Sequence, residues 1–430
     1  MTPLNELYNI FREFPKVITD SRQIEKDCLF FALKGENFNG NKFAADAIEK
    51  GAAFAIIDEA VFELPQKTLL VDDVLQTLKD LAHLHRTTLR LPILAITGTN
   101  GKTTTKELVA SVLAEKYRLS FTQGNLNNHI GVPLTLLKMD ESTEFGVVEM
   151  GANHPGEIEA LCKIADPDFG LITNIGKAHL EGFGSFEGVI QTKTELYRYL
   201  QAKQGLVFYN KSNILLEQLT TDVSNKISYG EKDADLVAEA IVSPPYLHLK
   251  ANFPRGALYL NTQLTGNYNF ENVLAAACIG QHFGVDPLKI QHALKNYQPK
   301  NNRSQLIVKN NLKITMDAYN ANPTSMNASI TSFMLNAVGE CHLILGDMLE
   351  LGEYAKDEHR SILERLKIYA GCNVYLVGKQ FFDLAGAYTF SAFEHVDFLC
   401  ETLQKTPITE GNVLIKGSRG IQLEKVLTCF

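Results

Sequence analysis

Short apolar runs alternate with helical patterns along most of the chain. The clearest runs are ILAIT, FGVVEM, FGLITNI and GLVFYN, at residues 93–97, 145–150, 169–175 and 205–210. Each is bounded by Gly, Asn or Asp, as strands buried on both faces of a parallel sheet tend to be. The pattern therefore predicts an α/β protein with a mostly parallel central sheet.

Two changes of pattern divide the chain into three predicted domains. The first block is small and ends in the helical stretch VLQTLKDLAHLHRTTLR, after which a new unit opens at a Leu-Pro pair. The Pro- and Asn-rich segment QPKNNRSQ marks a second boundary. We predict a small N-terminal α/β domain, a central domain and a C-terminal domain at residues 1–90, 91–299 and 300–430.

The second and third domains differ in their strand patterns. In residues 232–262 the runs YLHLK and GALYLN alternate between apolar and polar positions, which predicts an antiparallel insertion. The helical pattern NYNFENVLAAACIGQHF follows it. The third domain repeats strand and helix through LKITMDAY, CHLILGDM, NVYLVG and NVLIKG, which indicates a Rossmann-like α/β domain.

Composition narrows the class of protein. A chain of 430 residues can bury several cores, and its net charge of −8 argues against a protein that coats nucleic acid. The seven cysteines are scattered without a CxxC pair, which favours reduced thiols. No signal-peptide pattern opens the chain, and the longest uncharged stretch, 318–339, contains Pro323. We therefore expect a soluble cytoplasmic protein without stable membrane insertion.

The most specific short motif is ILAITGTNGKTTTKELVASVLAE, in which an apolar run enters a glycine-containing turn and then a helix. Such a turn aims backbone N–H groups at phosphate, and the helix N-terminus adds its positive end. Lys102 would neutralise phosphates, and the Thr103 hydroxyl would ligate Mg²⁺. The loop is a shortened variant, because the first glycine of GxxxxGK[ST] would fall at Ile96, so Gly98 and Gly101 serve as its hinges. The alternative is a simple turn with a solvated lysine.

Three further residues are candidates for a metal site. Glu149 ends the run GVVEM and would face the ligand crevice of the sheet, where it would hold Mg²⁺ directly or through water. His179 follows FGLITNI and would reach metal or phosphate, although a lone loop histidine is more often unremarkable. Lys193, in FEGVIQTKTELYRYL, reads from its spacing alone as a surface lysine.

Together these motifs resemble the Mur ligase family. GTNGKTTT, Glu149, His179 and Lys193 match its ATPase domain in order and approximate spacing. Members of the family activate a carboxylate with ATP to an acyl phosphate, which an amine attacks to give an amide, ADP and phosphate. The resemblance extends over nearly the whole chain through DSRQIEKDCLFFALKGENFNG, GNLNNHIGVPLTLL, EMGANHPGEIE, TGNYNFENVLAA, DAYNANPTSM, LGDMLELGEYAKDEH and IKGSRG.

Two of these strings point to one branch of the family. EMGANHPGEI and YNANPTSM match the ligases that join D-alanyl-D-alanine to UDP-N-acetylmuramoyl-tripeptide (UDP-MurNAc-tripeptide) during peptidoglycan precursor synthesis. The DNPR-type string of the sister ligase that adds the third residue is absent from the sequence. The resemblance implies a cytoplasmic, monomeric enzyme whose partners are ATP and these two substrates. The first domain would bind the UDP-substrate, the central P-loop-type domain ATP, and the third would act in ligation.

The resemblance also implies a role for each matching residue. Catalytic roles fall to Lys102, His179 and Lys193. Nucleotide binding falls to Gly98, Thr99, Asn100, Gly101, Lys102, Thr103, Thr104, Asn269, Asn272, Arg303 and Asp317. Substrate binding falls to Ser21, Arg22, Asn125, Asn127, Asn128, Asn320, Asn322, Ser418 and Arg419. Two Mg²⁺ ions are implied, one at Thr103 and Glu149 and one at His179 and a carbamylated Lys193, which reverses the surface interpretation of that lysine.

Some questions stay open at this point. Family members often carry DGH after the first-domain GENF string, whereas this chain has Asn39-Gly40-Asn41, so the contacts to the UDP-sugar are undefined. His359 is a candidate for the base that deprotonates the dipeptide amine, and its alternative role is to fix the third domain. Two alternative hypotheses for the function are another amide ligase, of folate or sister Mur type, and a non-catalytic nucleotide-binding module. The latter would require the loss of Lys102, Thr103, Glu149, His179 or Lys193, all of which are present.

Overall fold

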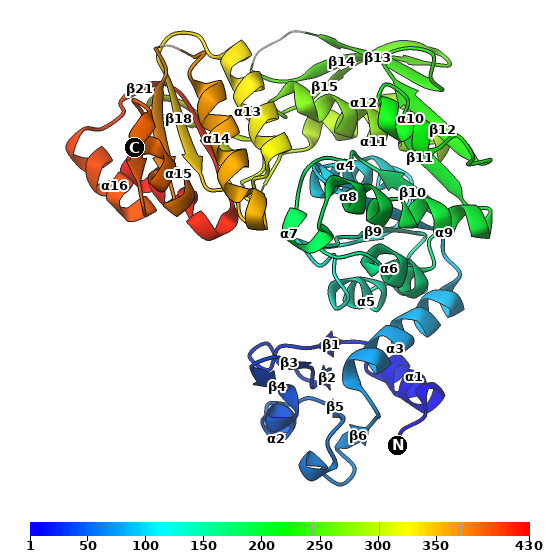
Figure 1. Cartoon of the computed structure of the whole chain (residues 1–430). Coiled ribbons are helices and arrows are strands. Elements are labelled where there is room, and N and C mark those ends of the chain that lie inside the picture. Colours follow the sequence, from blue (N-terminus) through cyan, green and yellow to red (C-terminus); the bar gives the residue numbers. More distant parts are fainter. Residues whose placement is uncertain (242–244, 301, 370) are drawn as a thin grey trace.

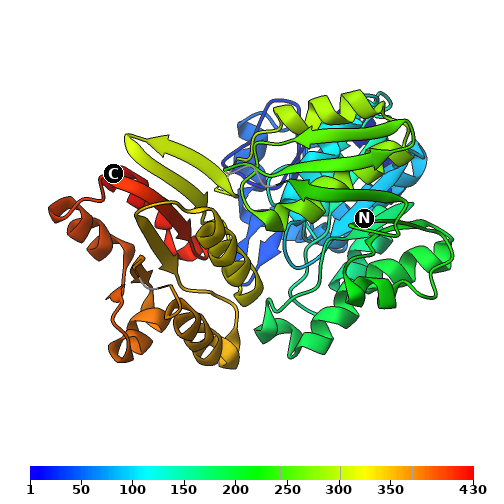
Figure 2. The same cartoon turned by 90° about the horizontal axis from the view of Figure 1, so that it is seen from above.

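The computed structural model describes residues 1–241, 245–300, 302–369 and 371–430. They form three units of sheet and helix that follow one another along the chain (Figure 1). The N-terminal unit lies at one end and is joined to the central unit through the long helix α3 (Val74–Leu89). The C-terminal unit lies beside the central one, and Figure 2 shows both from above. The prediction of a three-part α/β protein is confirmed.

The N-terminal unit is built on a parallel sheet in the order β1-β2-β5-β6. Strand β2 (Leu29–Phe31) is buried on both faces: Leu29 and Phe31 face α1 and α3, and Phe30 faces α2. The remaining elements are α1 (Leu4–Glu13), β1 (Val17–Ile18), β3 (Lys34–Gly35), β4 (Phe38–Asn39), α2 (Ala44–Glu49), β5 (Phe54–Ile57) and β6 (Thr68–Leu70).

Helix α3 also anchors the N-terminal unit to the central one. Arg86 donates to the backbone carbonyl of Ala165 at 3.1 Å and pairs with the carboxylate of Asp168 at 2.8 Å. The helix ends at Leu89, because Arg90 takes up a left-handed conformation with φ 53°. The predicted domain limit after residue 90 falls at this turn, and the predicted limits as a set stay a prediction.

The central unit has a sheet in the order β15-β14-β13-β12-β11-β10-β7-β9-β8. Its strands are β7 (Ile93–Thr97), β8 (Leu119–Phe121), β9 (Phe145–Glu149), β10 (Phe169–Ile172), β11 (Leu206–Asn210), β12 (Lys226–Gly230), β13 (Leu236–Ile241), β14 (His248–Phe253) and β15 (Gly256–Asn261). Its helices are α4 (Lys102–Leu113), α5 (Gly131–Leu136), α6 (Glu157–Ala165), α7 (Leu180–Phe183), α8 (Phe186–Lys193), α9 (Glu195–Lys203), α10 (Ile214–Leu219), α11 (Phe270–His282) and α12 (Pro287–Asn296).

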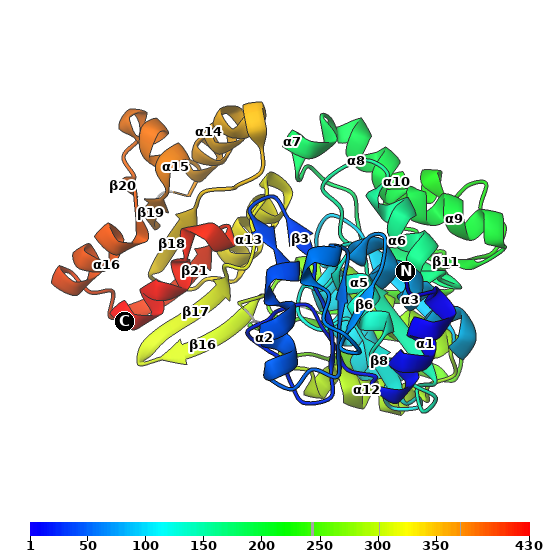
Figure 3. The same cartoon turned by 90° about the horizontal axis from the view of Figure 1, so that it is seen from below.

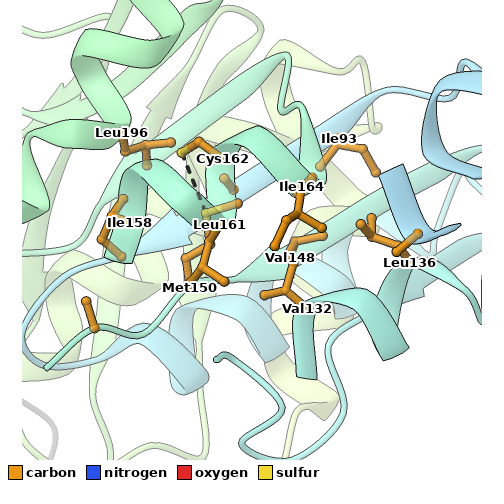
Figure 4. Packing of buried hydrophobic residues seen from close by; sticks show 14 of the residues in the cluster. Ile93, Val132, Leu136, Val148, Met150, Ile158, Leu161, Cys162, Ile164 and Leu196 are labelled. Carbon is orange, nitrogen blue, oxygen red and sulfur yellow. Dashed lines mark hydrogen bonds between the residues drawn. The ribbon is translucent and has the colours of Figure 1, made fainter. Parts of the chain in front are cut away.

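Alternation along β7 explains how helices cover both faces of this sheet. Ile93 and Ala95 pack into the cluster formed with α5, α6 and α9, part of which is drawn in Figure 4. Leu94 and Ile96 point the other way, into the cluster formed with α4, α11 and α12. Because successive side chains of a strand alternate between faces, a continuous apolar run is needed in a strand that is covered on both sides.

The segment predicted as an antiparallel insertion is part of the central sheet. The pairing of β13 with β14 and of β14 with β15 is antiparallel, as predicted. In addition, β13 pairs in parallel with β12, so this antiparallel segment extends the central sheet. The physical reason is that β12 would otherwise leave its backbone N–H and C=O groups unpaired at an edge.

The C-terminal unit has a second sheet, in the order β16-β17-β21-β18-β19-β20, which is parallel except at β16. Helices α13 to α15 cover one face, and α16 with η7 (Leu423–Cys429) covers the other. The elements are β16 (Gln305–Lys309), β17 (Asn311–Asp317), α13 (Pro323–Asn336), β18 (Cys341–Gly346), α14 (Ala355–Leu366), β19 (Asn373–Val377), α15 (Lys379–Leu384), β20 (Ser391–Phe393), α16 (Val396–Lys405) and β21 (Glu410–Lys416).

Candidate active site

The turn after β7 lies at the edge where the parallel strands β9, β7, β10, β11 and β12 all end. Gly98 has φ 141° and Gly101 has φ 78°, which non-glycine residues rarely adopt. A Cβ at Gly101 would also lie 2.5 Å from Oδ1 of Asn272. The two predicted hinges are therefore required both by backbone conformation and by close packing.

The neighbouring strand end fixes this turn. Asn174, just after β10, accepts a hydrogen bond from the backbone N–H of Asn100 at 3.0 Å and donates to its carbonyl at 3.1 Å. The hydroxyl of Thr99 exchanges hydrogen bonds with the backbone of Gly176. Sequence reasoning missed Asn174, although it belongs to the same strand-end pattern that singled out Glu149.

Lys102 opens α4 and is folded back onto its own turn. Its Nζ donates to the carbonyl oxygens of Gly98 at 2.8 Å and Thr99 at 3.0 Å. Burial lowers the pKa of Lys102 to about 8, with Arg303 acting in the same direction and Glu149 opposing it. An anion entering the turn would offer this ammonium better partners than two carbonyl groups.

Glu149, at the end of β9, is 1% exposed and lies beside Thr103. Its Oε1 accepts hydrogen bonds from the Thr103 hydroxyl at 3.1 Å and from the side-chain amide of Asn127 at 2.8 Å. Its Oε2 has no hydrogen-bond partner among the described residues, and the closest cation is Lys106, with Nζ at 3.7 Å. A buried carboxylate oxygen without a donor, next to a hydroxyl, suits a hard cation such as Mg²⁺.

His179 lies at the same sheet edge and meets the C-terminal unit. Its Nδ1 is 2.5 Å from Oε2 of Glu350, but the contact lies outside hydrogen-bond geometry, so this buried nitrogen has no hydrogen-bond partner among the described residues. The contact with His179 is the main reason why the pKa of Glu350 lies below its usual range. Sequence reasoning missed Glu350, because nothing in LELGE indicates that the third domain would reach this histidine.

Lys193 is 2% exposed, so its interpretation as a surface lysine is wrong. It ends α8 and points inward, with Nζ 5.5 Å from the ring centroid of Phe183. Burial lowers the pKa of Lys193 to about 7, and Lys102 adds to this, while Glu157 and Glu195 oppose it. The spacing failed here because α8 is covered by the loop that carries His179 and by α6, neither of which could be foreseen from α8 itself.

Asn269 and Asn272 are joined to the turn through side-chain hydrogen bonds. Asn272 accepts from the Thr105 hydroxyl at 2.9 Å and donates to Oδ1 of Asn269 at 2.8 Å. Asn269 in turn donates to the carbonyl of Thr265 at 2.8 Å. Their neighbour Glu271 lines the same cavity, and burial raises its pKa to about 7.

The C-terminal unit contributes the opposite wall. Asn322 donates to Oδ1 of Asn100 at 2.7 Å and caps the start of α13 with its side-chain oxygen. Arg303 stacks on Tyr319, with its guanidinium carbon 3.7 Å from the ring centroid. Asn320 accepts from the backbone N–H that follows it.

The carboxylate of Asp317, which is predicted to bind the nucleotide, already accepts hydrogen bonds from other side chains of the C-terminal unit. Its Oδ2 accepts from Lys416 at 2.6 Å and from the Ser329 hydroxyl at 2.9 Å. Burial would raise the pKa of Asp317, but Lys416 and Ser329 hold it below its usual value. Lys416, which sequence reasoning missed, is 2% exposed and also lines the cavity.

These walls enclose one cavity of about 1000 Å³. The predicted residues that line it are Thr99, Asn100, Gly101, Lys102, Thr103, Thr104, Asn125, Asn127, Asn128, Glu149, His179, Asn269, Asn272, Arg303, Asp317, Asn320 and Asn322. Oδ1 of Asn128 accepts from the backbone N–H of Gly131, the first residue of α5, at 2.9 Å. Most of the predicted nucleotide and metal residues are thus brought together.

The other predicted residues are not among those that line this cavity. Gly98 and Lys193 are two of them. Ser418 is buried and accepts from the backbone N–H of Leu349 at 3.0 Å, and the Arg419 guanidinium lies 5.8 Å from the Tyr319 ring. Ser21 and Arg22 belong to the N-terminal unit, where Arg22 is exposed and pairs with Asp20 at 2.8 Å.

His359 is fully buried inside the C-terminal unit. Its Nε2 accepts from the backbone N–H of Met348 at 3.0 Å, and its Nδ1 lies 2.6 Å from the carbonyl of Ala355. Because both ring nitrogens are engaged away from the cavity, the geometry matches the structural role and not that of a base.

Comparison with known proteins decides the family. The model described as Mur ligase middle domain matches residues 96–280, that of the glutamate ligase domain matches 302–418, and that of the Mur ligase family catalytic domain matches 14–86. The chain belongs to the Mur ligase family. The resemblance deduced from the motifs is therefore confirmed.

Several relatives match over nearly their whole length. The UDP-N-acetylmuramoyl-tripeptide–D-alanyl-D-alanine ligase of Bacillus subtilis is 34% identical over 422 residues, covering 96% of this chain and 92% of the relative. A crystal structure of MurF from Acinetobacter baumannii has a TM-score of 0.86 at 31% identity, covering 96% and 92%. MurF ligase from Thermotoga maritima in complex with ADP has a TM-score of 0.84 at 26% identity, covering 100% and 98%.

Among the residues that the structure describes, no helix is long and apolar enough to cross a membrane. The uncharged stretch noted in the sequence contains α13, which packs into the C-terminal core.

Proposed function

We propose that this chain is an ATP-dependent ligase that joins D-alanyl-D-alanine to UDP-MurNAc-tripeptide and releases ADP and phosphate. The observation that carries the proposal is a cavity of about 1000 Å³ between two domains, in which the glycine turn, a buried carboxylate and polar residues of the C-terminal unit meet. The names of the whole-length relatives support the choice of substrates.

The first step would transfer the γ-phosphoryl group of ATP to the carboxylate of the tripeptide. Both reactants are anions, so their approach must be screened. Lys102 and the backbone N–H groups of the turn would bind the phosphates, because the turn is already held open by Asn174 and Gly101. The local cations matter because the net charge of −8 gives no overall attraction for anions.

Thr103 and Glu149 would hold one Mg²⁺ ion. The fit rests on the Glu149 oxygen that lacks a hydrogen-bond donor, next to the Thr103 hydroxyl. When bound, the ion would neutralise charge that develops on the transferred phosphoryl group. Asn127 would keep the Glu149 carboxylate oriented through its existing hydrogen bond.

His179 and Lys193 would hold a second ion only after Lys193 is carbamylated. An ammonium group cannot ligate a metal, but a carbamate presents oxygens. Burial favours the neutral amine of Lys193, which is the form that reacts with CO₂. Labelled bicarbonate tests this: a ¹³C carbamate NMR signal should appear in the wild-type protein and be absent from Lys193→Ala.

The peptide substrates would be held by all three domains. Ser21 and Arg22 would contact the uridine end, Asn125, Asn127 and Asn128 the peptide, and Asn320, Asn322, Ser418 and Arg419 the site where the dipeptide amine attacks. Since Ser21 and Arg22 do not line the cavity, we propose that the N-terminal and C-terminal domains move onto the central one when substrates bind. Identical small-angle scattering profiles with and without substrates would contradict this movement.

Location and oligomeric state complete the proposal. All seven cysteines are unpaired, which suits the reducing cytoplasm where ATP and nucleotide-linked precursors are available. We propose a monomer, which sedimentation analysis would test.

Phosphate release from ATP tests the function directly. With UDP-MurNAc-tripeptide, the wild-type protein should release phosphate only when D-alanyl-D-alanine is also present, and the amide product should appear in equal amount. Replacing the dipeptide by glutamate, or the precursor by a folate, gives the control for another amide ligase. Turnover that is independent of the dipeptide would overturn the proposal.

A further inference from the structure

A second contact between the central and C-terminal units lies beside the cavity. The loop and short helix α7 after β10 meet the segment that runs through η4 (Gly352–Tyr354) into α14, as seen in Figures 1 and 3. The Tyr354 hydroxyl donates to the carbonyl of Gly184 at 3.3 Å, and Gly352 packs against Glu181. We call this contact, between residues 177–184 and 350–358, the interdomain seam.

Two ion pairs cross the seam, and they differ in what they touch. Glu350 approaches His179, which lines the cavity, whereas Glu358 pairs with Lys177 at 2.8 Å, and neither residue of that second pair lines the cavity. The Glu350 side chain is 55% exposed and the Glu358 side chain 15%. Exposed ion pairs contribute little to stability, so the two pairs differ mainly in that only the first contacts a residue that lines the cavity.

His179 and Glu350 both hold unusual backbone conformations, with φ values of 50° and 63°. Such left-handed non-glycine residues persist where the surrounding structure imposes them, and they cluster at functional sites. Each residue thus aims its side chain across the seam at a local cost in backbone energy.

The contact leaves one nitrogen of His179 free. The Glu350 carboxylate lies 2.5 Å from Nδ1 as an ion-pair contact outside hydrogen-bond geometry, while the ring edge packs against Phe183 with 6.3 Å between centroids. Within the described residues, no hydrogen-bond partner contacts Nε2. A carboxylate that binds one nitrogen of an imidazole fixes the tautomer and orients the other nitrogen as a metal ligand.

We propose that Glu350 is a positioning residue, supplied by the C-terminal domain, that orients His179 as a metal ligand only when the two domains are together. The inference rests on the proposed function, in which His179 holds the second ion. It makes the metal site of the central domain depend on the position of the C-terminal domain through one carboxylate.

Glu350→Ala and the matched control Glu358→Ala separate positioning from simple closure. Each variant removes one carboxylate from the same seam, and a role in closure alone would affect both alike. Glu350 is exposed enough for the variant to keep its fold.

The first readout needs neither metal nor substrate. In protein labelled with ¹⁵N-histidine, the His179 ring signals are assigned by their loss in His179→Ala. We expect one dominant tautomer, protonated at Nδ1, in the wild type and in Glu358→Ala, and a redistribution in Glu350→Ala. An unchanged tautomer in Glu350→Ala would overturn the proposal.

The second readout is the binding of Mn²⁺ in the presence of ADP, followed by electron paramagnetic resonance. Loss of an orienting partner lowers metal affinity about 10–100-fold, so we expect that fall at one site in Glu350→Ala and less than about twofold in Glu358→Ala. The His179→Ala variant and the double variant His179→Ala/Glu350→Ala should bind Mn²⁺ with equal affinity, because the carboxylate acts through the imidazole. Additive losses, or equal losses in the two seam variants, would refute positioning.

These measurements are independent of the peptide substrates. A wild-type protein that failed to join the dipeptide would overturn the proposed function, whereas the tautomer and Mn²⁺ results would still decide the role of Glu350.

Discussion

Two glutamates stand at the same sheet edge, on either side of the glycine turn that follows β7, in different electrostatic surroundings. Glu149 ends β9 and receives hydrogen bonds from Thr103 and Asn127, with Lys106 close by. Glu271, in the first turn of α11, lies on the side of β11 and β12. Its pKa is raised to about 7 by burial and by Glu231, and only a hydrogen bond with Asn210 opposes this.

The difference shows that the position of a carboxyl group at a strand or helix end does not decide its chemistry. Hydrogen-bond donors and a nearby cation surround Glu149, whereas burial beside another carboxylate raises the pKa of Glu271 and favours its neutral acid.

The largest effect should come from removing Lys102 itself. Lys102→Ala should lower turnover at least about 10³-fold, since transition-state charge on the phosphoryl group would lose a buried cation. The far-ultraviolet circular dichroism and melting temperature should stay close to wild type, because the lysine bonds only to its own turn. Retained turnover would show that the turn does not bind the reacting phosphates.

Glu149→Gln should have the next largest effect, and it tests the proposed metal-binding role of Glu149. The amide keeps the shape of the side chain but ligates Mg²⁺ poorly, so we expect turnover to fall about 10²-fold and the Mg²⁺ requirement to rise. Titrating activity against Mg²⁺ measures both. As a matched control, Glu271→Gln should leave the Mg²⁺ requirement unchanged, and equal shifts in both variants would contradict the contrast.

The fold was largely predictable because its buried strands appear in the sequence as continuous apolar runs. Runs such as ILAIT must be apolar throughout when helices cover both faces, and that property is local. The place of residues 232–262 was not predictable, because pairing of β13 with β12 depends on which edge of the sheet is free.

The site divides in a similar way. Lys102, Thr103 and Glu149 follow from strand ends and a glycine turn, which are local patterns. The burial of Lys193 and the contact of Glu350 with His179 arise from packing between distant segments. Lys106 shows the same limit, since its position in the first two turns of α4 does not reveal that it is fully buried beside Glu149.

Lys106→Met removes the cation near Glu149 and so makes the surroundings of Glu149 more like those of Glu271. Breaking a buried pair leaves an uncompensated charge, so the metal-free protein should lose about 3 kcal/mol of unfolding free energy. Mg²⁺ with ADP should restore more stability in this variant than in the wild type, because the ion no longer competes with an ammonium group. Chemical denaturation with and without Mg²⁺ and ADP measures the difference, and equal ligand stabilisation in both proteins would count against the Glu149 site.

Glu271→Gln tests the Glu271 side of the comparison through the pH dependence of stability. The pKa of Glu271 is raised in the folded protein to about 7, above the ordinary value of 4.5. The folded state therefore binds more protons than the unfolded one between these values, and this group makes the wild type less stable as pH rises from about 4.5 to about 7. The slope is at most about 1.4 kcal/mol per pH unit for one proton. Because glutamine imitates the neutral acid, the melting temperature of the variant relative to wild type should rise with pH through this window and level off above it. A difference that stays constant with pH would mean that the pKa of Glu271 is not raised in the folded protein, and the contrast between the two glutamates would fail.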